Sequence, residues 1–243
     1  MNKLTKPILT SLIALALFAA CNNTAAPTPT QETLVDNFSP VSGSSSPCVG
    51  IAEPTTVVNA SGAKQFAKPE QVIDPTHTYC AILRTGDGRI VIQLYPEVAP
   101  ANVNSFVFLA NQGYFDGLTF HRVLPGFMAQ GGDPLGDGTG GPGYALPLEV
   151  VPSVKFDREG VVAMARSQAP DSAGSQFFIT FAPQPALDPH SQQLPDNLGY
   201  TIIGQVVEGM NTVRGIKLRD PQQNPPFIGD PIVSIRIVDL GAK

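Results

Sequence analysis

The sequence predicts a mainly β fold with many turns. Charged residues make up only 14% of the 243 residues, and there are 23 glycines and 24 prolines, a composition that disfavours long helices. Several short runs alternate apolar and polar residues, which is the period of a half-buried strand. Asp87-Gly88 stands between two such runs and is a strong hairpin signal. Spacing alone leaves a β-barrel and a β-sandwich as alternatives.

The expected elements begin at residue 79, where 79–84 and 89–95 form the two strands of this hairpin. Pro100 suits the first position of a helix, the apolar residues at 103, 106, 107 and 110 share one face, and Gly113 ends it. The glycine-rich stretch 135–144 reads as a surface loop, because no Gly-Lys-Ser/Thr follows it. Four further strands and a short helix are expected, the strands at 160–165, 176–181, 200–207 and 232–240 and the helix at 210–216.

The first 20 residues have the layout of a signal peptide. Lys3 and Lys6 precede an apolar run too short to span a membrane. Small residues then stand directly before Cys21, as in a bacterial lipobox, although Phe18 departs from the usual aliphatic residue. We expect Cys21 to carry acyl chains that anchor the protein. The alternative is an ordinary secretory peptide with an incidental cysteine.

Composition divides the remainder into three parts. Residues 21–47 are rich in Thr, Pro, Ser and Asn and are expected to be a flexible tether. Residues 48–78 carry scattered apolar positions and are expected to be an extension packed on the domain formed by 79–243. Cys48 and Cys80 are the two thiols left once Cys21 is modified, so we expect a disulfide between them outside the cytoplasm. The alternative is a buried Cys80 and a free Cys48.

The most informative stretch is 120–133, which reads FHRVLPGFMAQGGD. It predicts two short strands around a Pro-Gly turn. This hairpin would place the permanent cation of Arg122 near Phe127, Met128 and Gln130. His121 would point the opposite way, so we expect a hydrogen-bonded wall residue there and not a base.

This stretch closely resembles the signature of the cyclophilins, the cyclosporin-binding type of peptidyl-prolyl cis-trans isomerase. A second stretch, 164–179, reads MARSQAPDSAGSQFFI and resembles the family's other hallmark in its bacterial form. The resemblance covers residues 79–240, within which the Pro- and Gln-rich residues 189–197 look like an insertion relative to short members of the family. It implies a closed eight-stranded antiparallel barrel capped by two helices, no cofactor, and proline-containing peptides as substrates.

The resemblance also implies roles for individual residues. The catalytic residues would be Arg122, Phe127 and Gln130. The substrate would be bound by Met128, Ala165, Arg166, Gln176, Phe178, Leu187 and Tyr200. Because Asn is common in the family at the position of Arg166, a side-chain change there is expected to be tolerated. Ala186 stands where the family often has Trp or Phe, which predicts weak cyclosporin inhibition.

We therefore expect a lipid-anchored isomerase of the bacterial cell envelope, outside the cytoplasm, that acts as a monomer on unfolded exported proteins. The net charge of −5 and the lack of a basic stripe argue against nucleic acid as a partner, and the three histidines are too scattered for a metal site. One alternative is a non-catalytic module or holdase chaperone that binds proline-containing segments. A weaker one is a scaffold with an inert barrel.

Overall fold

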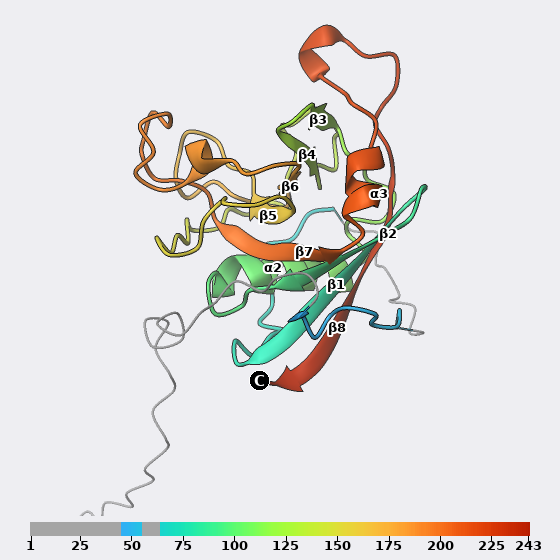
Figure 1. Cartoon of the computed structure of the whole chain (residues 1–243), viewed down its shortest axis with the longest axis vertical. Coiled ribbons are helices and arrows are strands. Elements are labelled where there is room, and N and C mark those ends of the chain that lie inside the picture. The colour runs from blue at the N-terminus through green and yellow to red at the C-terminus, as the bar shows by residue number, and fades with distance from the viewer. Residues whose placement is uncertain (1–44, 55–63) are drawn as a thin grey trace, which may run out of the picture.

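The computed structural model describes residues 45–54 and 64–243. Eight strands form one antiparallel sheet in the order β3-β4-β6-β5-β7-β2-β1-β8 (Figure 1). The strands are β1 (His77–Thr85), β2 (Arg89–Leu94), β3 (Arg122–Leu124), β4 (Met128–Gly131), β5 (Val161–Met164), β6 (Phe177–Thr180), β7 (Ile202–Glu208) and β8 (Ile232–Ala242). The helices are α2 (Pro100–Asn111) and α3 (Met210–Gly215), with short 3-10 turns η2 (Pro185–Leu187) and η3 (Pro221–Gln223). The mainly β prediction is confirmed.

Helix α2 starts at Pro100, as the sequence predicts. Glu149 caps its first turn, because the carboxylate accepts hydrogen bonds from the backbone of Ala101 (3.1 Å) and Asn102 (2.9 Å). A negative charge is favourable at this end of a helix. Gly113 follows the last turn with φ 64°, a left-handed conformation that suits glycine.

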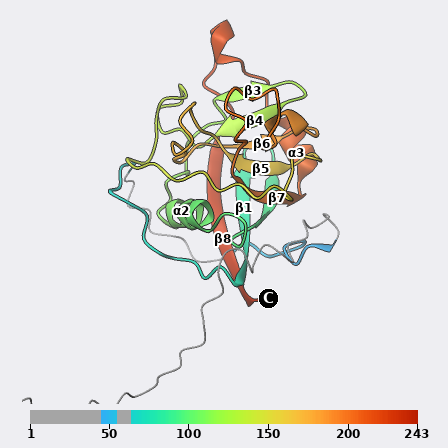
Figure 2. The same ribbon diagram turned by 90° about the vertical axis from the view of Figure 1, so that its left-hand side faces the viewer.

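Helix α2 lies beside the sheet (Figure 2), and buried residues of both belong to the main hydrophobic core. Phe106 of α2 packs against Phe115 and against Phe177 of β6, with ring centroids 5.1 and 5.5 Å apart. All three rings are fully buried. Aromatic pairs at these distances stabilise the fold beyond the area that they bury, so they hold α2 against the sheet.

The two ends of the sheet, β3 and β8, approach one another through their preceding segments. The backbone of Phe120 donates to Asp230 over 2.9 Å, and that of Ile232 donates to Leu118 over 2.7 Å. These two hydrogen bonds flank one isolated bridge, between Thr119 and Pro231, and no continuous ladder joins β3 to β8 in the described residues. Closure of the sheet into a barrel therefore stays a prediction.

The described parts of the extension are tied to the sheet. A disulfide joins Cys48 to Cys80 of β1 with a Cα–Cα distance of 5.7 Å, inside the range that a disulfide requires. Glu53 pairs with Arg84 at 2.5 Å, and the backbone of Gly50 donates to Glu208 over 3.0 Å. The signal peptide, Cys21 and most of the tether lie outside the described residues. In the described ranges, no helix is both long and apolar enough to cross a membrane.

Candidate active site

The site is built on three neighbouring strands whose register places a cation, an amide and an aromatic ring side by side. Arg122 of β3 stands opposite Gln130 of β4, and Gln130 stands opposite Phe178 of β6. Directly opposed residues in antiparallel strands share a face, so these three side chains emerge together. The alternate positions Val123 and Ala129 are fully buried on the other face. The alternation in 120–133 thus directs one set of side chains into the hydrophobic core and the other set into the site.

A chain of hydrogen bonds positions the cation. Arg122 donates to Gln130 Oε1 over 3.4 Å, and Gln130 Nε2 donates to Gln176 Oε1 over 2.9 Å. Gln176 Nε2 in turn donates to the carbonyl oxygens of Gly138 (3.0 Å) and Gly140 (2.9 Å). The Arg122 guanidinium carbon also lies 6.0 Å from the centre of the Phe127 ring. The sheet and the glycine-rich loop together therefore orient Arg122.

Beside Arg122 lies a cavity of about 130 Å³. Phe178 lies between two other rings: Tyr200 meets it edge-on at 5.7 Å and Phe156 stacks on it at 6.0 Å. The structure brings nearly all of the predicted site residues together here, and the cavity is lined by Arg122, Phe127, Met128, Gln130, Ala165, Arg166, Phe178, Leu187 and Tyr200. Gln176 lies outside this lining and acts on it through Gln130.

A wider groove lies next to this cavity, because Gln130, Ala165 and Arg166 line both. This part has a volume of about 480 Å³ and is walled by the glycine-rich loop at 138–142. The extension supports that wall from behind, because the backbone of Phe66 donates to the carbonyl of Pro142 over 2.7 Å and Gln65 donates to that of Gly141 over 2.9 Å. Residues of the extension, which precede the first strand in the chain, thus help to shape the groove.

Arg166 differs from its expected role as a replaceable border residue. Its side chain is only 4% exposed and pairs with Asp196 at 2.7 Å. It also donates to the carbonyl of Gly199 over 2.9 Å, and its guanidinium carbon lies 4.8 Å from the centre of the Tyr200 ring. Asn is too short to make these contacts together, so we revise the expectation that a change here is tolerated.

His121 is also different from the prediction. It is 1% exposed, yet neither ring nitrogen has a hydrogen-bond partner among the described residues, so it is not a hydrogen-bonded wall residue. Burial lowers the pKa of its imidazole, although the Asp133 carboxylate opposes this shift. His121 is not among the described residues that line the cavity, and that it is not a catalytic base stays a prediction.

Sequence reasoning missed two residues that shape the site. Phe156 packs under Phe178, but it comes from an irregular segment with no recognisable motif. Asp196 pairs with Arg166 from the Pro- and Gln-rich stretch, where nothing in the sequence marks a partner. Within the part of the chain that the structure describes, no group of three or more His, Cys, Asp or Glu residues is placed to hold a metal ion.

The fold and the site together indicate a protein that binds a small apolar ring in this cavity, next to the guanidinium of Arg122. The described residues that line the cavity are mostly apolar, and the permanent cation of Arg122 stands beside them. Proline is the residue with a compact apolar ring. A hydrogen-bond donor next to the proline ring could favour rotation about the peptide bond that precedes it.

The chain belongs to the cyclophilin-type peptidyl-prolyl cis-trans isomerase family, whose model matches residues 80–240. It is a peptidyl-prolyl cis-trans isomerase. Peptidyl-prolyl cis-trans isomerase B of Bacillus subtilis is 43% identical over 132 residues, which is 54% of this chain and 85% of that protein. A peptidyl-prolyl cis-trans isomerase of Synechococcus elongatus is 41% identical over 160 residues, 65% of this chain and 95% of that protein.

Solved structures agree with this assignment. A cyclophilin-type isomerase of Cryptosporidium parvum, crystallised in the presence of the dipeptide Ala-Pro, matches with a TM-score of 0.57 at 31% identity. The match covers 65% of this chain and 98% of that one. The cyclophilin AquaCyp293 from Hirschia baltica matches with a TM-score of 0.53 at 24% identity and supports the fold alone.

Proposed function

We propose that this isomerase works outside the cytoplasm of a bacterial cell, anchored to a membrane through Cys21, and accelerates X–Pro bond rotation in exported proteins. The observation that carries the catalytic part is the register of Arg122, Gln130 and Phe178, which places a held cation beside an apolar cavity. The Ala-Pro dipeptide in the crystallisation of the Cryptosporidium relative is consistent with a proline-containing substrate.

Rotation of an X–Pro bond passes through a twisted amide that has lost its resonance. The barrier without a catalyst is about 18–20 kcal/mol, and no bond to a nucleophile is needed to lower it. In the twisted state the prolyl nitrogen becomes pyramidal and regains its lone pair, which can accept a hydrogen bond. Arg122 donates that hydrogen bond. The interaction is stronger in the transition state than in either planar isomer, which is the condition for catalysis.

The remaining side chains hold the substrate. Met128, Phe178 and Leu187 are each at most 7% exposed and form apolar walls for the proline ring. Gln130 holds Arg122 from one side, and its Oε1 accepts from the guanidinium over 3.4 Å. A guanidinium has five N–H donors, so others remain for the substrate. Binding the ring in the cavity positions the prolyl nitrogen next to that cation.

Two features support a site of action outside the cytoplasm. Small residues stand directly before Cys21 after an apolar run with a basic start. The Cys48–Cys80 disulfide is fully buried, and disulfides persist mainly in oxidising compartments. The tether would then hold the isomerase domain away from the membrane surface.

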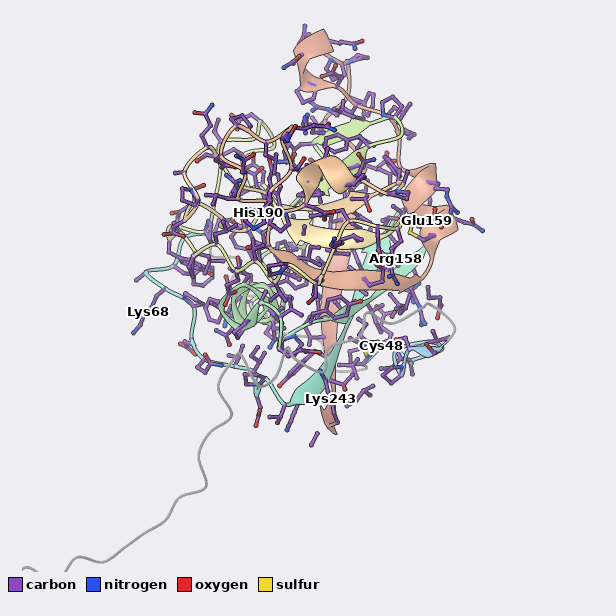
Figure 3. All side chains as sticks on the ribbon, turned by 60° about the vertical axis from the view of Figure 1, so that its left-hand side comes forward. Cys48, Lys68, Arg158, Glu159, His190 and Lys243 are labelled. Atoms are coloured by element: carbon purple, nitrogen blue, oxygen red, sulfur yellow. A yellow bond between two sulfur atoms is a disulfide. The ribbon has the colours of Figure 1, made fainter. Side chains whose placement is uncertain are left out.

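A peptide isomerisation assay tests the catalytic proposal. Arg122→Ala is expected to lower kcat/KM by about 10²-fold or more, because it removes the hydrogen bond that Arg122 donates to the prolyl nitrogen in the transition state. Arg158→Ala is the matched control, since the half-buried Arg158 pairs with its neighbour Asp157, is not among the described residues that line the cavity, and lies apart from His190 in Figure 3. If wild-type protein binds proline peptides without accelerating their isomerisation, it is a binding module or holdase.

Membrane fractionation tests the anchoring proposal. Cys21→Ser is expected to move the protein from the membrane fraction to the soluble fraction with isomerase activity unchanged. Mass spectrometry of the mature protein should find an acylated amino terminus at Cys21. An unmodified terminus at any other residue would contradict the lipid anchor while leaving the catalytic proposal intact.

A further inference from the structure

Residues 189–197 form a Pro- and Gln-rich loop, here called the insertion, next to the 130 Å³ cavity that we propose for the substrate proline, here called the proline cavity. It connects η2, which supplies Leu187 to the cavity, with the segment that leads through Tyr200 into β7. The loop closes on itself, because the backbone of His190 donates to the carbonyl of Asn197 over 2.7 Å. Leu194 packs against the hydrophobic core and is partly buried. The insertion therefore has a defined shape at its position beside the site.

Arg166 joins the insertion to the wall of the cavity. Its guanidinium pairs with Asp196 at 2.7 Å and also donates to the carbonyl oxygens of Gly199 (2.9 Å) and Ser167 (3.0 Å). The same group lies over the ring of Tyr200. Since the side chain is 4% exposed and its charge is matched by Asp196, Arg166 presents little free charge to a ligand.

A second cavity, of about 530 Å³, lies between the insertion and this wall. Arg166 and Tyr200 line both this cavity and the proline cavity, so the two are neighbours. Leu194 and Pro195 supply apolar surface from the insertion, and the Tyr200 ring supplies it from the opposite wall. A peptide whose proline occupies the first cavity would bring an adjoining residue to the second.

We propose that this second cavity is a substrate subsite that selects an apolar side chain next to the substrate proline. The proposal rests on the isomerase activity and adds a specificity to it. An acidic side chain would have to displace Asp196 from Arg166, and a basic one would have to displace Arg166 from Asp196. Aliphatic and aromatic side chains meet Leu194, Pro195 and Tyr200 without breaking the pair, and their burial is favourable.

The test is a set of short peptides with one proline, flanked on either side in turn by Ala, Leu, Phe, Glu or Lys, assayed with the full chain. Wild-type protein is expected to show kcat/KM about 10-fold higher for Leu or Phe than for Ala at one flanking position. Equal values for Ala, Leu and Phe at both flanking positions would overturn the subsite. No acceleration of any peptide would instead refute the activity itself.

Variants locate the preference. Leu194→Ser is expected to bring the kcat/KM values of the Leu and Ala peptides within about 2-fold of each other, because the apolar wall of the subsite is lost. Leu198→Ser is the matched control, since Leu198 is 40% exposed and does not line the cavity. A preference that survives Leu194→Ser unchanged would place the selectivity elsewhere.

A charge variant gives a second, independent readout. Asp196→Asn keeps the size of the side chain but leaves Arg166 without its counter-ion, so the Glu peptide is expected to gain at least about 3-fold in kcat/KM relative to the Ala peptide. The Lys peptide should not gain. If the Glu peptide is unaffected, the cavity does not contact the substrate and the proposal fails, whatever the folding of Leu194→Ser.

Discussion

Arg122 and Gln130 stand directly opposite each other on β3 and β4, and the guanidinium donates to Gln130 Oε1 over 3.4 Å. Gln130 is held in turn by Gln176, which is fixed to two carbonyl oxygens of the glycine-rich loop. The cation is thus oriented before a substrate arrives. Preorganised donors are effective in catalysis because they need no rearrangement at the moment of reaction.

The first prediction concerns the shape of the cation. Arg122→Lys keeps the charge but replaces a planar fork with a compact ammonium, which cannot hold Gln130 and reach the prolyl nitrogen in the same geometry. We expect kcat/KM on an Ala-Pro peptide to fall by about 10-fold or more, with the circular dichroism spectrum unchanged. Wild-type efficiency in this variant would show that charge alone suffices.

The second prediction concerns the attachment of the insertion. Arg166→Asn removes the ion pair with Asp196 and the hydrogen bond to Gly199, so the loop at 189–197 should open. Limited proteolysis followed by mass spectrometry is expected to find faster cleavage within this loop than in wild-type protein. Arg158→Asn, which breaks an exposed pair elsewhere, should leave the cleavage rate unchanged. Equal rates in all three proteins would restore the view that Arg166 is replaceable.

The third prediction concerns the disulfide. Cys48 and Cys80 are 32 residues apart, and closing a loop of this size is expected to add about 3–4 kcal/mol to the free energy of unfolding. The double variant Cys48→Ser/Cys80→Ser should lose about that amount in urea unfolding. A reducing agent should destabilise wild-type protein and leave the double variant unchanged. Rapid alkylation of both cysteines in the native oxidised protein would contradict the bond.

The fourth prediction concerns pH. Burial lowers the pKa of His121 in the folded protein below its ordinary value of 6.5. Between the lowered pKa and pH 6.5, the unfolded chain therefore binds a proton that the folded protein does not. The stabilising effect of a neutral His121 is therefore complete above pH 6.5 and is lost as the pH falls through the folded pKa. We expect His121→Phe to flatten this part of the stability profile, whose slope from one group is at most about 1.4 kcal/mol per pH unit.

His77 provides a control of opposite sign. A hydrogen bond with Asp239 raises the pKa of His77, so its contribution is present below pH 6.5 and is lost as the pH rises through the raised value. Urea unfolding measured from about pH 5 to pH 8 should therefore separate the two variants, with His77→Asn altering the profile above 6.5 and His121→Phe altering it below. An unchanged profile for His121→Phe below pH 6.5 would contradict the fourth prediction.

The fifth prediction concerns cyclosporin. Ala186 lies on η2 next to Leu187 of the proline cavity and is partly buried, but it lacks the ring that many family members have there. We expect weak inhibition of the wild-type protein. Ala186→Trp should lower the inhibition constant by about 10-fold, because an indole adds a stacking wall and a hydrogen-bond donor. Tight inhibition of the unaltered protein would count against this reasoning.

Local pattern was enough to predict much of this protein. The alternation in 120–133 around a Pro-Gly turn predicted the hairpin that places Arg122 near Gln130, because the strand period is two. Pro100 and the apolar spacing after it predicted α2. The two long motifs identified the family and, with it, the residues that line the proline cavity. These features depend on near neighbours in the chain, so the sequence contains them directly.

Only the tertiary structure decided how distant segments meet. Arg166 and Asp196 are 30 residues apart and no motif includes both, so their pairing depends on how the insertion packs against the wall of the cavity. Phe156 reaches Phe178 from an irregular segment, and His121 is buried without a hydrogen-bond partner among the described residues. Such contacts depend on how the whole chain packs. Which distant residues touch is determined by the close packing of the folded protein, and the residues next to them in the sequence do not specify it.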